Sequence, residues 1–327
     1  MHSHAGQRKQ SAALLSILSN SSLVVGKLVI GLLCSSVAVI SEAVHSASDL
    51  MASIMAYAAV RMSDSPPDED HPYGHGKIES ISSLAEALLI FAAALYIVYE
   101  AVHKLLKPPT SSPPLYLAMG VMAVSVVVNY FISRYLRKVG KETDSQALLA
   151  DAEHLKVDVI TAAGVCLGLG LAQLTGKTWL DPLAALGVAL LIFKAAWELC
   201  LEALQPLMDA RLPLEEEQQV RGVLNGDPRV LGYHKLRTRK SGSQRHVDVH
   251  VQLDDDITLL EAHQVSEDLE DEIRKLLPML LINIHIEPYL AEMQHQLEVH
   301  GLRPEELNQK EFPSEELVEA NLAKLSG

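Results

Sequence analysis

Two pairs of histidine and aspartate with the same spacing lie within long apolar stretches of the sequence. His45 and Asp49 are four residues apart in one stretch, and His154 and Asp158 repeat this spacing in another. On a helix, residues four apart project within about 40° of each other, so each pair shares a face. An aspartate near the middle of a membrane helix costs about 2.5 to 3.5 kcal/mol, and such residues usually face a cavity or a partner. The two pairs therefore predict a polar site between helices.

Two imidazoles and two carboxylates form a ligand set that suits tetrahedral Zn²⁺, whose charge would balance the two aspartates. Metal binding requires neutral imidazole and ionised carboxylate, and it therefore displaces protons. A site that opens to each side of a membrane in turn would exchange a divalent metal for protons. The alternative for each pair is structural: the histidine bonds a backbone carbonyl and the aspartate lies near an interface.

The helices that would carry these residues are predicted from hydropathy, because a membrane-crossing helix needs about 20 mostly apolar residues. We expect a transmembrane domain over residues 1–207 with six helices, at about 11–37, 39–60, 80–105, 115–137, 146–174 and 178–206. The N-terminus and the loops at 61–77 and 134–141 hold eight Lys and Arg, against three on the opposite side. The positive-inside rule therefore predicts that both termini are cytoplasmic.

The chain changes character near residue 207. Residues 208–327 carry 24 Asp and Glu against 13 Lys and Arg, which accounts for −11 of the net charge of −14. Helical and strand patterns alternate over residues 208–290 and predict a compact α/β domain. Its predicted helices are 214–224 and 259–277, and its predicted strands are 230–238, 244–253 and 280–287. Residues 291–327 are predicted to form a polar, helix-prone tail, to which we assign no function.

The composition excludes several other classes of protein. A net-acidic surface argues against sequence-independent binding of nucleic acid, which depends on clustered Lys and Arg. The three cysteines lie in separate apolar stretches without C-x-x-C spacing, so they indicate neither a disulfide framework nor a thiolate metal site. The first apolar stretch lacks a clear cleavage site, which favours a retained span over a removed signal peptide.

Four motifs occur together in the chain: HSASD at 45–49, DEDHPYGHGKIES at 68–80, HLKVD at 154–158 and HKLRTRKSG at 234–242. With them, about residues 11–290 resemble the cation diffusion facilitator family, in particular its bacterial zinc-efflux (Zn²⁺/H⁺ antiporter) branch. The resemblance implies a homodimer in the inner membrane, with a six-helix transmembrane bundle and a cytoplasmic domain similar to metallochaperones and ferredoxins. It also implies proton-coupled efflux of divalent metal by alternating access, the work of a secondary active transporter and not of an enzyme.

The resemblance also implies three metal sites, with Zn²⁺ as transported substrate and regulatory ligand. His45, Asp49, His154 and Asp158 would form the transport site, and Asp68, His71 and His75 a second site in a loop. A binuclear cytoplasmic site would use His234, His250, His263, His285 and Glu287, the last where the family commonly has Asp. From the residues alone, a hydrated acidic loop and scattered surface histidines remain the alternatives for the latter two sites. His246 shares a strand face with His250 and is a weaker candidate ligand.

Other functions remain open at this stage. The ligand set disfavours Mn²⁺ but separates Zn²⁺ poorly from Cd²⁺, and an exporter of Fe²⁺, Cd²⁺ or Mn²⁺ is the alternative within transport. A membrane-anchored metal sensor is the alternative from another class, although an anchor needs no buried His and Asp on two helices. A membrane metalloenzyme is disfavoured because four protein ligands close the metal site and no H-E-x-x-H motif is present.

Overall fold

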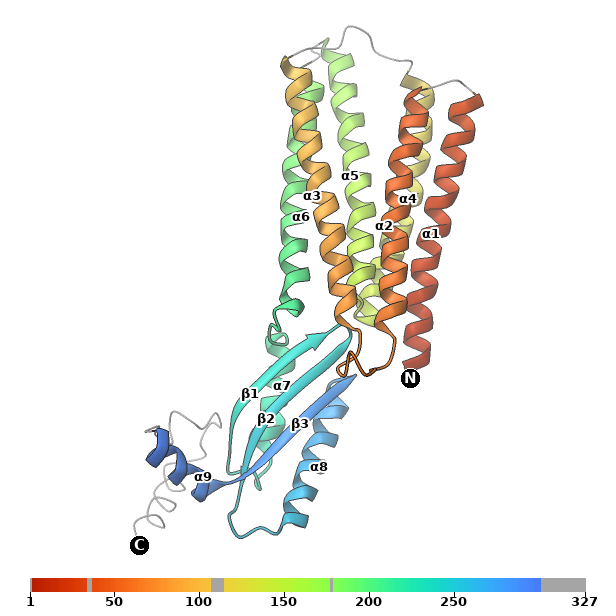
Figure 1. Ribbon diagram of the computed structural model, residues 1–327. Coiled ribbons are helices and arrows are strands. Elements are labelled where there is room, and N and C mark those ends of the chain that lie inside the picture. Colours follow the sequence, from red (N-terminus) through yellow and green to blue (C-terminus); the bar gives the residue numbers. More distant parts are fainter. Residues whose placement is uncertain (1, 34–36, 107–114, 177–178, 301–327) are drawn as a thin grey trace. The chain divides into compact units, whose positions relative to one another are not determined.

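The computed structural model describes residues 2–33, 37–106, 115–176 and 179–300 (Figure 1). The chain divides into two compact units, Met1–Met208 and Asp209–Gly327. Part of the predicted tail, from residue 301 onward, and the proline-rich connection at 108–114 lie outside the described residues.

The first unit is built from six long helices, which run side by side in Figure 1. They are α1 (His2–Leu33), α2 (Val37–Ser63), α3 (Lys77–Leu106), α4 (Leu115–Thr143), α5 (Gln146–Thr175) and α6 (Leu180–Leu207). Three stretches among the described residues are long and apolar enough to cross a membrane: Gly6–Leu33, Lys77–Leu106 and Pro182–Leu207. The structure thus has six long helices where six spans are predicted, but within the described residues three of them qualify as spans by length and composition, so the number of spans is not confirmed.

The helix α1 begins at His2, nine residues before the predicted start at residue 11, and the charged side chain of Lys9 has partners within the unit. Lys9 is 3% exposed, and its Nζ donates to Asp64 Oδ1 and to Glu79 Oε1, both at 3.1 Å. Glu79 is fully buried and also accepts hydrogen bonds from Ser63 Oγ at 2.8 Å and from Ser145 Oγ at 2.6 Å. This carboxylate thus joins one end of α1, α2, α3 and α5.

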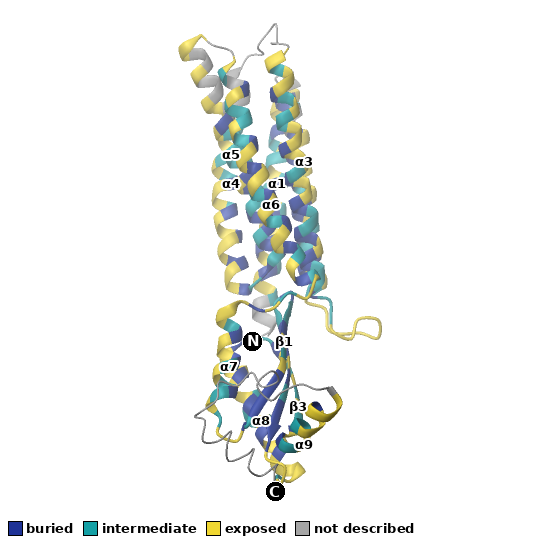
Figure 2. Ribbon diagram, turned by 90° about the vertical axis from the view of Figure 1, so that its left-hand side faces the viewer, coloured by how far each residue is buried: buried dark blue, intermediate teal, exposed yellow. Residues whose placement is uncertain are grey.

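The outward faces of the helices in the first unit carry large apolar side chains. Leu190 and Leu191 on α6 are 69% and 63% exposed, and Leu88 on α3 is 55% exposed. Figure 2 shows exposed positions along the outer faces of these helices, with buried positions between the helices. Such a pattern is typical of a bundle whose outer surface contacts lipid instead of water.

The second unit is a three-stranded sheet with two helices that pack on one of its faces. Its elements are α7 (Leu214–Gly226), β1 (Gly232–Ser241), β2 (Gln244–Leu253), α8 (Leu259–Leu276), β3 (Leu280–Pro288) and α9 (Tyr289–His295), followed by a π-helical turn at Gln296–His300. The central strand β2 pairs antiparallel with β1 and parallel with β3. The hairpin between β1 and β2 turns at Gly242, whose φ of +59° is one that glycine adopts without strain.

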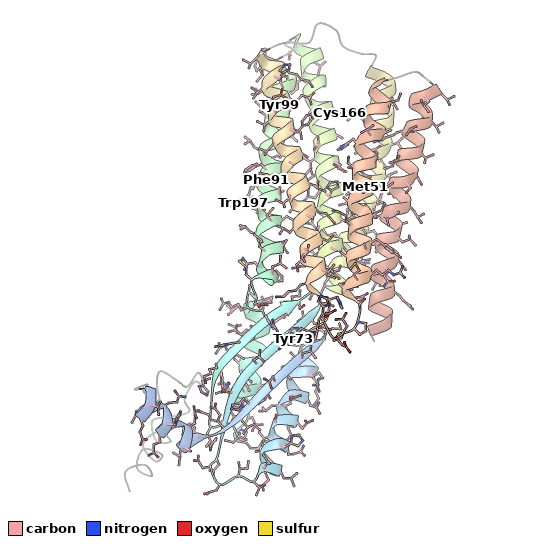
Figure 3. The ribbon with its side chains drawn as sticks, viewed as in Figure 1. Met51, Tyr73, Phe91, Tyr99, Cys166 and Trp197 are labelled. Carbon is pink, nitrogen blue, oxygen red and sulfur yellow. The ribbon has the colours of Figure 1, made fainter. Side chains whose placement is uncertain are left out.

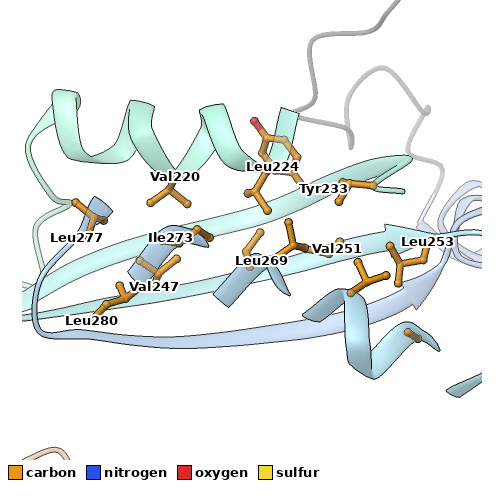
Figure 4. Close-up of a cluster of buried hydrophobic side chains, with 14 of the residues drawn as sticks. Val220, Leu224, Tyr233, Val247, Val251, Leu253, Leu269, Ile273, Leu277 and Leu280 are labelled. Atoms are coloured by element: carbon orange, nitrogen blue, oxygen red, sulfur yellow. The ribbon is translucent and has the colours of Figure 1, made fainter. Parts of the chain in front are cut away.

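The core of the second unit lies between the sheet and the helices α7 and α8 (Figure 4). Val247, Val249 and Val251 of β2 point into this core, and Val220 of α7 and Leu269 of α8 pack from the other side. Because side chains alternate along a strand, the even-numbered residues of β2 face away from these helices. The opposite face of the sheet is therefore available for polar side chains.

Candidate metal centre

The helices α2 and α5 bring together the two His-x-x-x-Asp pairs, and Met51 and Cys166 mark these helices in Figure 3. The pairs cross: His45 Nε2 lies 3.8 Å from Asp158 Oδ1, and His154 Nε2 lies 3.4 Å from Asp49 Oδ1. Ligand atoms of His45, Asp49 and Asp158 all lie within 4.8 Å of one another. All four predicted residues of the transport site therefore lie together.

This site between α2 and α5 has a buried side and an open side. Asp49 is 4% exposed, whereas the side chain of His45 is 56% exposed. The buried atoms His154 Nδ1 and Asp158 Oδ2 have no hydrogen-bond partner. A buried carboxylate oxygen without a partner is costly, and a cation that bound these residues would provide one. The donor set of two imidazoles and two carboxylates therefore fits a divalent metal.

A charged residue of α1 lies beside this site and was left unassigned by the sequence interpretation. Lys27 is 5% exposed, and its Nζ donates to Ser46 Oγ at 2.8 Å. Ser46 follows His45 directly on α2, so this hydrogen bond links α1 to the turn of α2 that carries two of the four site residues. The only signal of Lys27 in the sequence is that it is a charged residue within an apolar stretch.

The loop between α2 and α3 brings Asp68, His71 and His75 together, and Tyr73 marks this loop in Figure 3. Asp68 Oδ1 lies 3.1 Å from His71 Nδ1, and Asp68 Oδ2 lies 3.2 Å from His75 Nε2. The backbone N–H of His71 donates to Asp68 Oδ1 at 2.6 Å. This hydrogen bond, with the two nearby histidines, lowers the pKa of Asp68, so the carboxylate is ionised and ready to bind a cation.

The second unit has a row of three histidines on the sheet face that points away from α7 and α8. His234, His250 and His285 are neighbours across β1, β2 and β3 in the strand register. The ring centroids of His234 and His250 are 5.1 Å apart, and those of His250 and His285 are 4.6 Å apart. The sheet therefore aligns three residues that are up to 51 positions apart in sequence, from 234 to 285.

Glu287 links two of these histidines. His234 Nε2 donates to Glu287 Oε2 at 2.6 Å, and His250 Nδ1 donates to Glu287 Oε1 at 2.5 Å. Burial raises the pKa of Glu287, but the hydrogen bonds and charges of the two histidines outweigh burial and lower it overall. The longer Glu thus reaches both imidazoles from the position where the resemblance leads one to expect Asp. His285 Nε2 lies farther away, 3.7 Å from Glu287 Oε1.

A β-bulge in β1 sets the direction of His234. The register between β1 and β2 shifts between His234 and Arg237, and Lys235 adopts a φ of +51°. The bulge allows Tyr233 and Leu236 to pack on the core side while His234 faces Glu287. Strict alternation would instead place His234 and Leu236 on the same face. Bulges are common beside functional sites, where they redirect a side chain.

His263, a predicted ligand, and His246, a weaker candidate, lie outside this cluster. The side chain of His263 is 67% exposed on α8, where its nearest ion-pair partner is Glu267 at 3.9 Å. Since α8 packs on the other face of the sheet, His263 is not part of this cluster within a single chain. His246 is buried and pairs with Leu281 in the register, two positions along β2 from Asp248. Gln252, by contrast, lies beside the cluster, and the sequence analysis did not identify it as a neighbour of the site. It is 4% exposed and pairs with Glu287 in the register.

Comparisons with known families match almost the whole of the first unit and the sheet-containing part of the second. A family model described as the cation efflux transmembrane domain matches residues 13–208, and one described as the cytoplasmic domain of cation efflux proteins matches residues 212–289. The chain belongs to the cation efflux, or cation diffusion facilitator, family. The resemblance inferred from the four motifs is thus confirmed, and the chain is a membrane transporter of metal cations from a family that contains no enzymes.

Curated members of the cation efflux family resemble the chain over most of its length. The cation-efflux pump FieF of Pectobacterium atrosepticum is 35% identical over 80% of this chain and 86% of its own. The manganese efflux system protein MneP of Bacillus subtilis is 32% identical over 89% of this chain and 100% of its own. A solved zinc form of CzrB is 32% identical over 24% of this chain and 90% of its own, with a TM-score of 0.23.

Proposed function

We propose that this cation efflux protein exports Zn²⁺ from the cytoplasm in exchange for protons. The observation that carries this proposal is the crossed arrangement of two histidines and two aspartates between α2 and α5. Two nitrogen and two oxygen ligands suit tetrahedral Zn²⁺, and the two carboxylates balance its charge. Zn²⁺ is in this case the transported substrate, held by His45, Asp49, His154 and Asp158.

Proton coupling follows from the chemistry of these ligands. Zn²⁺ binds only ionised carboxylate and neutral imidazole, so it competes with protons for the same four residues. Histidine changes its protonation near neutral pH, which makes release of Zn²⁺ easier towards the more acidic side. A site that faces each side in turn then exchanges Zn²⁺ for protons, and this is the alternating-access cycle that we propose.

The membrane arrangement is part of the same proposal. We propose that all six helices α1–α6 cross the bacterial inner membrane and that both termini are cytoplasmic, because Lys and Arg concentrate in the loops on that side. We also propose a homodimer, since the family model that matches residues 212–289 has a name that refers to dimers.

The loop cluster and the cytoplasmic cluster are proposed as regulatory zinc sites. Asp68, His71 and His75 have the composition and proximity of a three-ligand site. His234, His250 and Glu287 form a second such group, with His285 beside it. Metal binding couples to folding, so an ion at either cluster would stabilise the conformation that brings its ligands together.

The proposal is tested by Zn²⁺ uptake into proteoliposomes that contain the full chain, with an imposed pH gradient. We expect uptake to follow the gradient and to fall to the background level of protein-free liposomes in Asp49→Ala and in Asp158→Ala. His103→Ala is the matched control, since His103 is an exposed histidine near the end of α3 and should leave uptake unchanged. Uptake that survived both aspartate substitutions, or that ignored the gradient, would remove the transport-site assignment.

Export of Mn²⁺ is the second candidate, and one observation favours it. The relative whose printed name is manganese efflux system protein covers 89% of this chain. Two imidazoles nevertheless suit Zn²⁺ better than Mn²⁺, which prefers oxygen ligands. Uptake measured in parallel with Mn²⁺, Fe²⁺ and Cd²⁺ separates the candidates, and faster uptake of Mn²⁺ than of Zn²⁺ would favour the manganese assignment.

A further inference from the structure

A second buried carboxyl lies inside the first unit and belongs to none of the three metal clusters. Glu86 on α3 is 0% exposed, and neither of its carboxyl oxygens has a hydrogen-bond partner. It lies well inside the stretch Lys77–Leu106, which is long and apolar enough to cross a membrane. Nine residues of helix, or about 13 Å, separate it from the start of α3.

The surroundings of Glu86 contain one further carboxyl and one imidazole. On α5, Asp151 and His154 are the ionisable groups that interact electrostatically with Glu86. Asp151 is also fully buried: its Oδ1 accepts from Ser53 Oγ of α2 at 3.1 Å, whereas its Oδ2 has no partner.

Among the described residues of α2 and α6, none is a hydrogen-bond partner of Glu86. On α2, Asp49 belongs to the transport site, and the neutral Ser53 donates to Asp151. On α6, Lys194 and Glu198 are 75% and 66% exposed and lie 3.7 Å from each other, and Glu202 is exposed as well. Two buried carboxyls near one imidazole are therefore the local set of ionisable groups around Glu86.

This arrangement favours the neutral, protonated carboxyl of Glu86 over the ionised carboxylate. An ionised carboxylate without a partner in an apolar interior is far more costly than a neutral carboxyl. Two carboxylates in the same low-dielectric region also repel each other, so such a pair retains a proton when no cation is near. The ligand atoms around Glu86 do not converge into a metal cluster among the described residues, whereas those of His45, Asp49 and Asp158 do.

We propose that Glu86 is a proton-carrying residue of the transport cycle, one that adds a proton to those exchanged at the metal ligands. The inference rests on the proposed function and deepens it. When a divalent cation binds at the transport site beside His154, its positive charge favours the ionised form of Glu86. The O–H bond of the carboxyl breaks, the electron pair remains on the carboxylate, and the proton leaves to the side to which the site is open. Release of the metal reverses this step.

The test counts the protons released per Zn²⁺ bound by the purified full-length protein. Zn²⁺ is titrated into weakly buffered protein with a pH indicator, and bound Zn²⁺ is counted in parallel. We expect Glu86→Gln to bind the same number of Zn²⁺ ions per chain while it releases up to one proton fewer. The pH dependence of its Zn²⁺ affinity should also become less steep, by up to tenfold per pH unit.

Glu198→Gln is the matched control, because it removes an exposed carboxyl from a helix of the same unit and should leave proton release unchanged. Glu86→Asp should restore part of the proton release, which loss of packing alone would not do. Equal proton release by the protein and by Glu86→Gln would overturn the proposal. So would the loss of one bound Zn²⁺, since Glu86 would then be a metal ligand.

The variant Asp151→Asn keeps the proposal testable if Glu86→Gln does not fold. Without the charge of Asp151, Glu86 loses its like-charged neighbour, and proton release should fall because the pair no longer shares a proton. Unchanged release would count against the proposal. Failure of the proposed function is seen separately, as Zn²⁺ uptake that does not depend on Asp49 and Asp158, while proton release can still be measured.

Discussion

The two principal metal clusters use the same residue types in opposite ways. At the site between α2 and α5 the crossed His–Asp pairs are 3.4 and 3.8 Å apart, and Asp158 Oδ2 is buried without a partner. In the second unit, Glu287 already accepts two hydrogen bonds of 2.5 and 2.6 Å. The first arrangement leaves ligand atoms available to a passing ion, whereas an ion that binds Glu287 in the second must replace the two hydrogen bonds to this carboxylate. Transport needs the first property, and a site that responds only to sufficient metal needs the second.

The largest expected effect contrasts the two clusters in stability. Glu287→Ala should lower the free energy of unfolding of the metal-free second unit by about 1 to 3 kcal/mol, because it leaves the buried His234 without its acceptor. Asp158→Ala should cost little or even stabilise the first unit, since it removes a carboxylate whose buried Oδ2 has no partner, and its neighbour His45 is exposed to solvent. Thermal unfolding of the full chain in detergent, with a probe in each unit, measures both. Equal destabilisation by the two variants would show that the contrast is wrong.

The next effect concerns the affinity of the cytoplasmic cluster. His250→Ala removes a ligand that contacts Glu287, and we expect it to weaken Zn²⁺ binding at this cluster by about 100-fold. His285→Ala removes a ring that lies 3.7 Å from Glu287, and we expect a loss of about tenfold. Asp248→Asn is the control, because Asp248 is an exposed residue of the same strand. The ranking is wrong if His285→Ala weakens binding as much as His250→Ala does.

A smaller effect follows from the pKa of Glu287. Hydrogen bonds from His250 and His234 lower this pKa below its ordinary value of 4.5 in spite of burial. A lowered pKa in the folded state means that the ionised carboxylate stabilises the fold above about pH 4.5, and that this contribution is lost as the pH falls through the folded pKa. The stability difference between the protein and Glu287→Gln should therefore shrink as the pH falls from 6 to 3. Denaturant unfolding of the metal-free protein measures it, and a constant difference would contradict the assigned cause.

The smallest effect on stability is expected in the loop. Asp68→Asn should remove one bound Zn²⁺ per chain but change the free energy of unfolding by less than about 0.5 kcal/mol, because the side chain of Asp68 is half exposed. Metal counting by mass spectrometry under native conditions measures the first quantity, and thermal unfolding the second. Asp70→Asn, in the same exposed loop, is the control for both. Unchanged Zn²⁺ content in Asp68→Asn would show that the loop is a hydrated acidic segment and not a metal site.

The sequence predicted those parts of the sites that depend on local periodicity. His45 with Asp49, and His154 with Asp158, share helix faces because each pair spans about one turn. That His45 faces Asp158 while Asp49 faces His154 depends on how α2 and α5 pack, and nothing in either helix alone encodes it.

The cytoplasmic cluster shows where such prediction ends. Strand alternation places His285 and Glu287, which are two residues apart, on one face of β3, and their side chains approach to 3.7 Å. The row of histidines also requires the bulge at Lys235 and the parallel register of β3, and both depend on contacts between distant segments. His263 lies outside the row because α8 packs on the opposite face of the sheet. The residues around His263 do not determine on which face α8 packs.

Glu79 also has a consequence for the biosynthesis of the protein. Its carboxylate holds Lys9 of α1 and Ser145 at the start of α5, although α1 leaves the ribosome four helices before α5. The end of α1 therefore completes its packing only after four more helices have been made. A truncation that removed Lys9 would leave Glu79 buried without its cation, at a cost of about 3 to 5 kcal/mol. Such a chain would be expected to fail in assembly and to reach quality control before it could move any ion.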